Sequence, residues 1–159
     1  MSFVSQGGGQ SNAYTFTDRT VYAFSICHEK FTDAIDRFSQ FFTDPLFDPS
    51  GLHREINAIN QEHDKNLEND LWRGWMVFKE TGNPKHPNSL FSTGNKHTLA
   101  NIPREVVKRW HREHYSSDRM HLVLYSSLSL DQLEQLVTTA FSSIPVSYTH
   151  LRAHETRHD

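Results

Sequence analysis

The feature that most constrains the fold is a change in the spacing of apolar residues near residue 29. Before it, Tyr22, Phe24 and Ile26 alternate with other residues at the two-residue period of a pleated strand. After it, apolar residues recur every three or four positions as far as Thr43, the period of an amphipathic helix. Both periods in one chain predict an α+β fold, in which helices pack on a sheet.

The rest of the sequence extends this pattern. The stretch from Ser11 to Ile26 predicts a hairpin, because Asp18-Arg19 falls where a turn would divide it. Helices are predicted over residues 50–79 and 103–114, and another from the capping box at residues 129–132. A further strand is predicted over residues 120–128. We therefore expect a two-layer sandwich of a mostly antiparallel sheet and helices.

Length and charge set the limits of the domain and of its partners. The chain has 159 residues and a formal net charge of −3, which gives no reason to expect nucleic acid or an anionic membrane as a partner. A single cysteine, Cys27, fits a reducing compartment and is expected to be a small buried residue. The regular pattern stops after Pro145, so residues 1–145 are predicted to form the domain and residues 146–159 a separate polar tail.

The most informative segment for chemistry lies in the long helix predicted over residues 50–79. Glu55 and Glu62 are seven residues apart, so on a helix they share one face and are separated by about 10 Å. Asn66 and Asn69 continue that face, which is separate from the apolar stripe and free to line a cleft. A carboxylate is a good ligand for Zn²⁺ and also holds other ligands in place. Two glutamates on a solvated helix face are nevertheless common, and the spacing alone favours that simpler interpretation.

Several blocks of sequence, in a consistent order, favour a functional role for the two glutamates over the simpler interpretation. They are the glycine-rich residues 7–15, REINA and QEH within residues 54–63, NPKHPNS and FSTGN within residues 83–95, and HYSSDRM at residues 114–120. Together these blocks resemble the insulinase (pitrilysin, inverzincin) family of zinc metallopeptidases. The resemblance is closer to the insulysin branch of that family than to its processing-peptidase branch.

The resemblance implies a role for each matching residue. Glu62 matches the third zinc ligand, and Glu55 matches the acidic catalytic-site residue that supports the zinc site from the same helix. Asn12 and Ala13 match an exposed strand whose backbone pairs with an extended peptide substrate, although a plain core strand is the alternative. For the full-length protein the resemblance implies Zn²⁺ as cofactor, peptide substrates, a homo-oligomer and a cytoplasmic location.

The inverted zinc motif of this family, H-x-x-E-H, does not occur in the sequence. It supplies two histidine ligands and a glutamate general base. At Glu62-His63 the first histidine position holds Ile59, and at Glu113-His114 it holds Trp110. In the family this motif precedes the glycine-rich strand, so we expect the domain to be truncated before residue 1 and the sandwich to be incomplete at its N-terminus. A tight zinc site takes three or four ligands, so this chain alone is expected to be inactive.

Two other interpretations stay open. A non-catalytic homologue would keep the fold as a scaffold or interaction subunit, and a degraded H-x-x-E-H upstream would support it. The second is a zincin site, because His154-Glu155-Thr156-Arg157-His158 fits H-E-x-x-H. Positive charge at Arg152 and Arg157 and the lack of an apolar face argue against that site. Residues 147–158 instead resemble a translated sequencing adapter, which would make the tail a disordered or artefactual segment unrelated to the domain.

Overall fold

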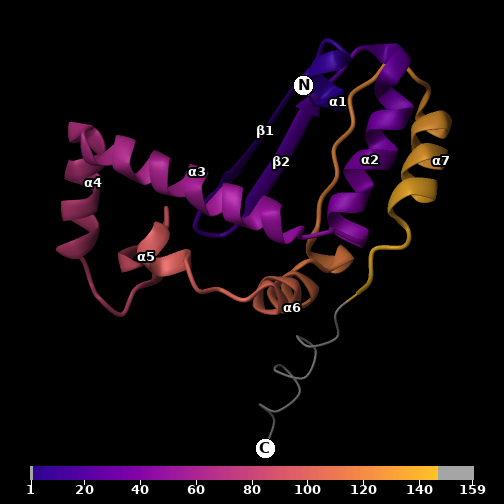
Figure 1. Ribbon diagram of the computed structural model, residues 1–159. Helices are drawn as coiled ribbons and strands as arrows, with labels where there is room; N and C mark the ends of the chain where they lie inside the picture. The colour runs from indigo at the N-terminus through magenta and orange to yellow at the C-terminus, as the bar shows by residue number, and fades with distance from the viewer. Residues whose placement is uncertain (1, 147–159) are drawn as a thin grey trace, which may run out of the picture. The chain divides into compact units, whose positions relative to one another are not determined.

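The computed structural model describes residues 2–146, and the chain divides into two compact units. One unit contains Met1–Leu46 and the chain from Arg109 onward, and the other contains Phe47–Lys108. Seven α-helices and one two-stranded antiparallel sheet are found in the described residues (Figure 1). The predicted α+β class is therefore confirmed.

The first unit begins with a short helix and a hairpin. Helix α1 (Phe3–Gln6) leads into β1 (Gln10–Thr15), which pairs with β2 (Thr20–Ser25). Two glycines allow the segment between α1 and β1 to pass close to the end of β2. Gly8 adopts a φ of 68°, and a Cβ on Gly9 would lie 1.8 Å from the Ser25 carbonyl oxygen. The predicted hairpin is confirmed.

Helix α2 (Phe31–Thr43) covers the hairpin, after a 3₁₀ turn at His28–Lys30. Phe38 packs against Phe24 with ring centroids 5.1 Å apart, and Phe42 packs against Tyr22 at 5.7 Å. Helix α7 (Leu130–Phe141) lies alongside α2 (Figure 1) and starts at the predicted Ser129–Gln132 capping box. The sequence therefore predicted α2 and α7 correctly, whereas α1 was not predicted.

The strand predicted over residues 120–128 is wrong. After a 3₁₀ turn at Ser117–Arg119, residues 120–125 pair with no strand of the described chain. Tyr125 is 99% exposed and Val123 is 89% exposed. The alternating pattern is present, but a strand also requires a backbone partner. The prediction of a buried Cys27 is also wrong, because its side chain is exposed.

The second unit contains α3 (Pro49–Leu67), α4 (Asp70–Glu80), a 3₁₀ turn at Pro87–Ser89 and α5 (Lys96–Leu99). It also contains the start of α6 (Arg104–His114), whose last residues belong to the first unit. None of the helices between residues 2 and 146 has the length and apolar character needed to cross a membrane.

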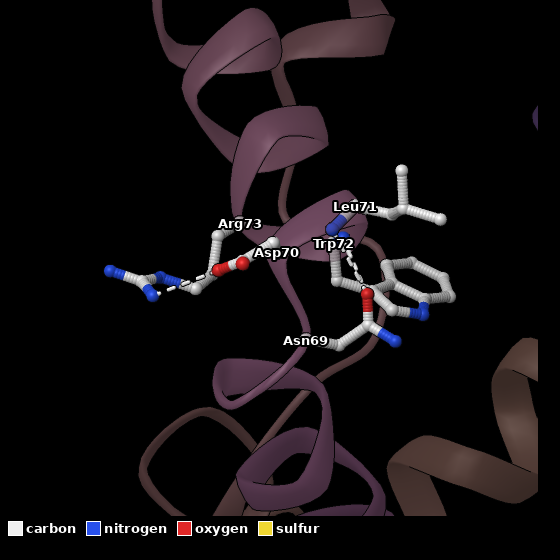
Figure 2. Close-up of polar contacts among 5 residues, drawn as sticks. All are labelled: Asn69, Asp70, Leu71, Trp72 and Arg73. Carbon is white, nitrogen blue, oxygen red and sulfur yellow. Dashed lines mark hydrogen bonds and ion pairs between the residues drawn. The ribbon is translucent and has the colours of Figure 1, made fainter.

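The single helix predicted over residues 50–79 is wrong, because α3 and α4 are separate helices. Figure 2 shows the cause, a cap at Asn69. Its side-chain oxygen accepts the N–H groups of Leu71 at 3.0 Å and Trp72 at 3.3 Å. Asparagine is a favoured cap because it satisfies first-turn N–H groups that have no partner within the helix. The chain therefore starts a new helix at a position where the apolar stripe alone predicts continuation.

Candidate functional site

The helix that carries the candidate acidic residues has a well-defined start. The Asp48 carboxylate accepts the Gly51 N–H at 2.7 Å and the Ser50 hydroxyl at 2.5 Å, and Pro49 occupies the first turn. The Ser50 hydroxyl, and then the Gly51 N–H, hold the pKa of Asp48 below its usual value. From this cap α3 runs unbroken to Leu67. One continuous helix therefore carries both predicted glutamates.

Glu55 and Glu62 are both exposed. Seven residues along one helix bring them to the same face, about 10 Å apart along the axis. Within residues 2–146, neither carboxylate makes a hydrogen bond or an ion pair. Asn66 lies one turn beyond Glu62, and its side-chain nitrogen is buried with no hydrogen-bond partner in that same part of the chain. Both carboxylates are therefore exposed to solvent in the described part of the chain.

A loop holds the neighbouring flank of α3. Asn60 accepts the N–H of Lys96, the first residue of α5, at 3.1 Å and donates to Asp64 at 2.8 Å. His63 packs edge-on against Phe91, with ring centroids 5.3 Å apart. The loop that resembled a family block thus contacts α3 through two pairings that the sequence did not predict, Asn60 with Lys96 and His63 with Phe91. These contacts leave the side chains of Glu55 and Glu62 exposed.

The described residues do not form a complete metal site. No group of three His, Cys, Asp or Glu side chains among residues 2–146 is placed to hold a metal ion. A protein zinc site takes three or four ligands, so Glu55 and Glu62 fit only part of one, and no reaction step through a metal follows from them. The alternative pair, His154 and His158, lies outside the described residues.

The predicted substrate strand is exposed at all six positions of β1, including Asn12 and Ala13. It pairs with β2 along one side, where Asn12 lies opposite Ala23 and Ala13 lies opposite Tyr22. Its other side has no partner strand in the described part of the chain. Among the described residues, β1 is therefore exposed and pairs with β2 alone. The Ala13 N–H donates to the Asn12 side-chain oxygen at 2.9 Å.

A polar contact behind this strand was missed by the sequence analysis. The hydroxyl groups of Tyr22 and Tyr115 hydrogen-bond to each other, and His111 stacks on Tyr115 with ring centroids 4.3 Å apart. Burial, and then the bond to Tyr22, raises the pKa of Tyr115. Burial lowers the pKa of His111, whose ring nitrogen lies 3.2 Å from the Phe41 carbonyl oxygen. Because the two tyrosines are 93 residues apart, no local pattern could reveal this pair.

Comparison with known proteins identifies the class of protein and then the family. The sequence profile of Insulinase (Peptidase family M16) matches residues 1–85, and that of the Peptidase M16 inactive domain matches residues 101–158. The fold and these matches are those of zinc metallopeptidases. Among them, the chain belongs to the insulinase family.

Individual relatives agree with this assignment. The insulin-degrading enzyme of Bos taurus is 45% identical over 149 residues, which cover 89% of this chain and 15% of that protein. The A-factor-processing enzyme of Saccharomyces cerevisiae is 39% identical over 150 residues, which cover 90% and 15%. The crystal structure of pitrilysin matches with a TM-score of 0.85 and 32% identity, over 91% of this chain and 16% of that one. The chain thus spans about 15% of the length of the curated relatives that it matches.

Proposed function

We propose that the chain is part of a zinc metalloendopeptidase and supplies one metal ligand, Glu62, to its active site. The observation that carries the proposal is the pair of exposed carboxylates, without partners among the described residues, on one face of α3 in a chain of the insulinase family. Zn²⁺ in the full-length protein would supply the chemistry that activates water. In this chain, Glu62 would bind the ion, and Glu55 would hold neighbouring ligands in place.

The proposed substrates are peptides in an extended conformation. An edge strand accepts such a peptide by adding it as a further strand, and main-chain hydrogen bonds then supply the affinity. The exposed edge of β1 at Asn12 and Ala13 supports this role. Each addition to the sheet requires backbone groups that are not already paired with β2, and an antiparallel strand presents such groups at alternate residues.

The chain by itself is proposed to bind no stoichiometric zinc and to cleave no peptide. A tight zinc site is worth about 10–16 kcal/mol and requires three or four ligands, more than Glu62 and Glu55 provide. The test is to measure zinc by mass spectrometry after dialysis and peptide cleavage with and without a chelator. Stoichiometric zinc that depends on Glu62, or chelator-sensitive cleavage by the pure chain, would overturn this part of the proposal.

The full-length protein provides the test of the individual roles. Glu62→Gln is expected to remove bound zinc and activity together, and Glu55→Gln to weaken both. Glu68→Gln, at the exposed C-terminal end of the same helix, is the matched control and should change neither. If the wild-type full-length protein binds no zinc and cleaves no peptide, it is the scaffold or interaction subunit instead.

The domain boundaries and the cell biology are also proposals. We propose that residues 1–145 form the domain and that residues 146–159 are unrelated to it. The inactive-domain profile extends to residue 158, beyond the proposed boundary. Finding the codons of the tail in frame in genomic DNA would refute that boundary. The single cysteine supports a cytoplasmic protein, which imaging of a tagged full-length protein tests. Sedimentation of the full-length protein tests the proposed homo-oligomer.

A further inference from the structure

Asn12 makes an unusual contact for a residue in the middle of a strand. Its side-chain oxygen accepts the N–H of the next residue, Ala13, at 2.9 Å. Asparagine is depleted in strands because its side chain competes for nearby backbone groups. In β1 the competing contact involves an N–H that the hairpin does not use.

The pairing of the hairpin shows why this N–H is available. The Phe16 N–H donates to the Arg19 carbonyl at 2.8 Å, at the turn end of the ladder. In an antiparallel pair, the residues that bond to the partner strand alternate with those that do not. Counting back from Phe16, the N–H groups of Asn12 and Tyr14 face β2, and that of Ala13 faces the free edge. Ser11 and Thr15 have the same outward orientation, so Ala13 is the central outward donor of β1.

We infer that Asn12 guards this edge: its side chain occupies the Ala13 N–H in the free chain and turns away when an extended peptide pairs with β1. The inference rests on the proposed function, because it names the contact that a peptide has to displace. A peptide replaces that contact only by presenting its own carbonyl to Ala13. The guard therefore favours fully extended peptides, and it also limits edge-to-edge pairing between copies of the chain.

The contact itself can be measured without any ligand, by amide hydrogen exchange of Ala13 in the free chain. A net hydrogen bond of this kind corresponds to about a two- to tenfold change in an equilibrium. Asn12→Ala should speed Ala13 exchange by about that factor, after correction for the intrinsic effect of the side chain. Asn12→Asp keeps an acceptor and should stay near the wild-type rate. Unchanged exchange in Asn12→Ala would overturn the guard.

Gln10→Ala is the matched control for this exchange measurement and for the peptide-binding measurement that follows. Gln10 lies on the same strand, two residues from Asn12 and therefore on the same face. Its side-chain amide makes no hydrogen bond within residues 2–146, whereas its backbone lies opposite Ser25 in the hairpin and its N–H donates to the Ser25 hydroxyl at 3.4 Å. Its removal should change neither Ala13 exchange nor peptide binding.

Peptide binding tests what the guard does. The probe is a fluorescent peptide of about nine residues, alternating Thr and Val between terminal lysines, with an N-methylated version that cannot pair. Asn12→Ala should bind the first peptide about two- to tenfold more tightly than wild type, and the N-methylated peptide should not bind. Equal or weaker binding by Asn12→Ala would overturn the guard. If no variant binds while Ala13 exchange responds to Asn12, the contact stands and the proposed substrate edge is overturned.

Discussion

The paired hydroxyl groups of Tyr22 and Tyr115 give the sharpest test of how the first unit is held together. Tyr22 lies in β2 and Tyr115 follows α6, so their bond joins segments far apart in the sequence. Both side chains are half-buried. A hydroxyl that loses its partner in such a site costs about 1–3 kcal/mol. Because water still reaches part of each ring, we expect Tyr22→Phe to lower the free energy of unfolding by about 1–2 kcal/mol.

The two substitutions should not be additive. Tyr115→Phe leaves the Tyr22 hydroxyl alone and should cost a similar amount, whereas the double variant removes both groups and leaves nothing unpaired. We therefore expect a coupling energy of about 1 kcal/mol between the two positions. Urea unfolding followed by tryptophan fluorescence measures it in a background with Trp72→Phe and Trp75→Phe, which leaves Trp110, 6.0 Å from the Tyr115 ring, as the reporter. Tyr125→Phe, at a fully exposed ring, is the control and should have no effect.

The pH dependence provides a second readout of the same pair. Burial raises the pKa of Tyr115, so the folded chain holds this proton more tightly than the unfolded chain does. The resulting stability is fully present below the unfolded pKa, about 10, and is lost as the pH rises above it. Unfolding free energy should thus fall more steeply above pH 10 in the wild type than in Tyr115→Phe. Additive single variants, or equal slopes, would refute a coupled hydroxyl pair.

Three further predictions concern caps and one histidine. Asn69→Ala removes the acceptor for two α4 N–H groups and should cost about 1 kcal/mol, seen as faster amide exchange at Leu71 and Trp72; unchanged exchange would contradict it. Ser129→Ala should lower the thermal stability of α7 by a similar cap contribution, about 1 kcal/mol, while Ser129→Thr retains most of it; equal melting of the two variants would count against the cap. Burial lowers the pKa of His111, so the neutral ring stabilises the folded chain above the unfolded pKa, about 6.5, and this stabilisation is lost as the pH falls. His111→Gln should therefore reduce the fall in melting temperature between pH 7.5 and 5. An unchanged slope would refute this prediction.

The parts of the fold that the sequence predicted correctly are those with local causes. The hairpin follows from a two-residue period and a turn, and α2 follows from its apolar stripe. The start of α7 follows from the reciprocal bonds of Ser129 and Gln132, which lie three residues apart. In each case the stabilising interaction joins residues that are near one another in the chain, so the local sequence pattern is enough to predict the element.

The failures have non-local or competing causes. Residues 120–128 alternate as a strand does, but pairing depends on which backbone lies beside them, and the sequence does not contain that information. The apolar stripe continues from Leu67 to Leu71, yet the cap formed by Asn69 between them ends one helix and starts the next. For the candidate site, the spacing of Glu55 and Glu62 predicted a shared helix face, but the loop contact through Asn60 could not be predicted from spacing.

The lack of contacts around the two glutamates decides how clearly their function can be tested. Asn60 bonds to both α3 and α5, so changing it would alter the fold and the site together. Glu55 and Glu62 are exposed and make no hydrogen bond or ion pair in the described part of the chain, so their replacement by glutamine should change the unfolding free energy by less than about 0.5 kcal/mol. Unfolding of this chain measures that directly. If Glu62→Gln leaves stability unchanged here but removes zinc from the full-length protein, the loss arises from the missing ligand and not from damage to α3.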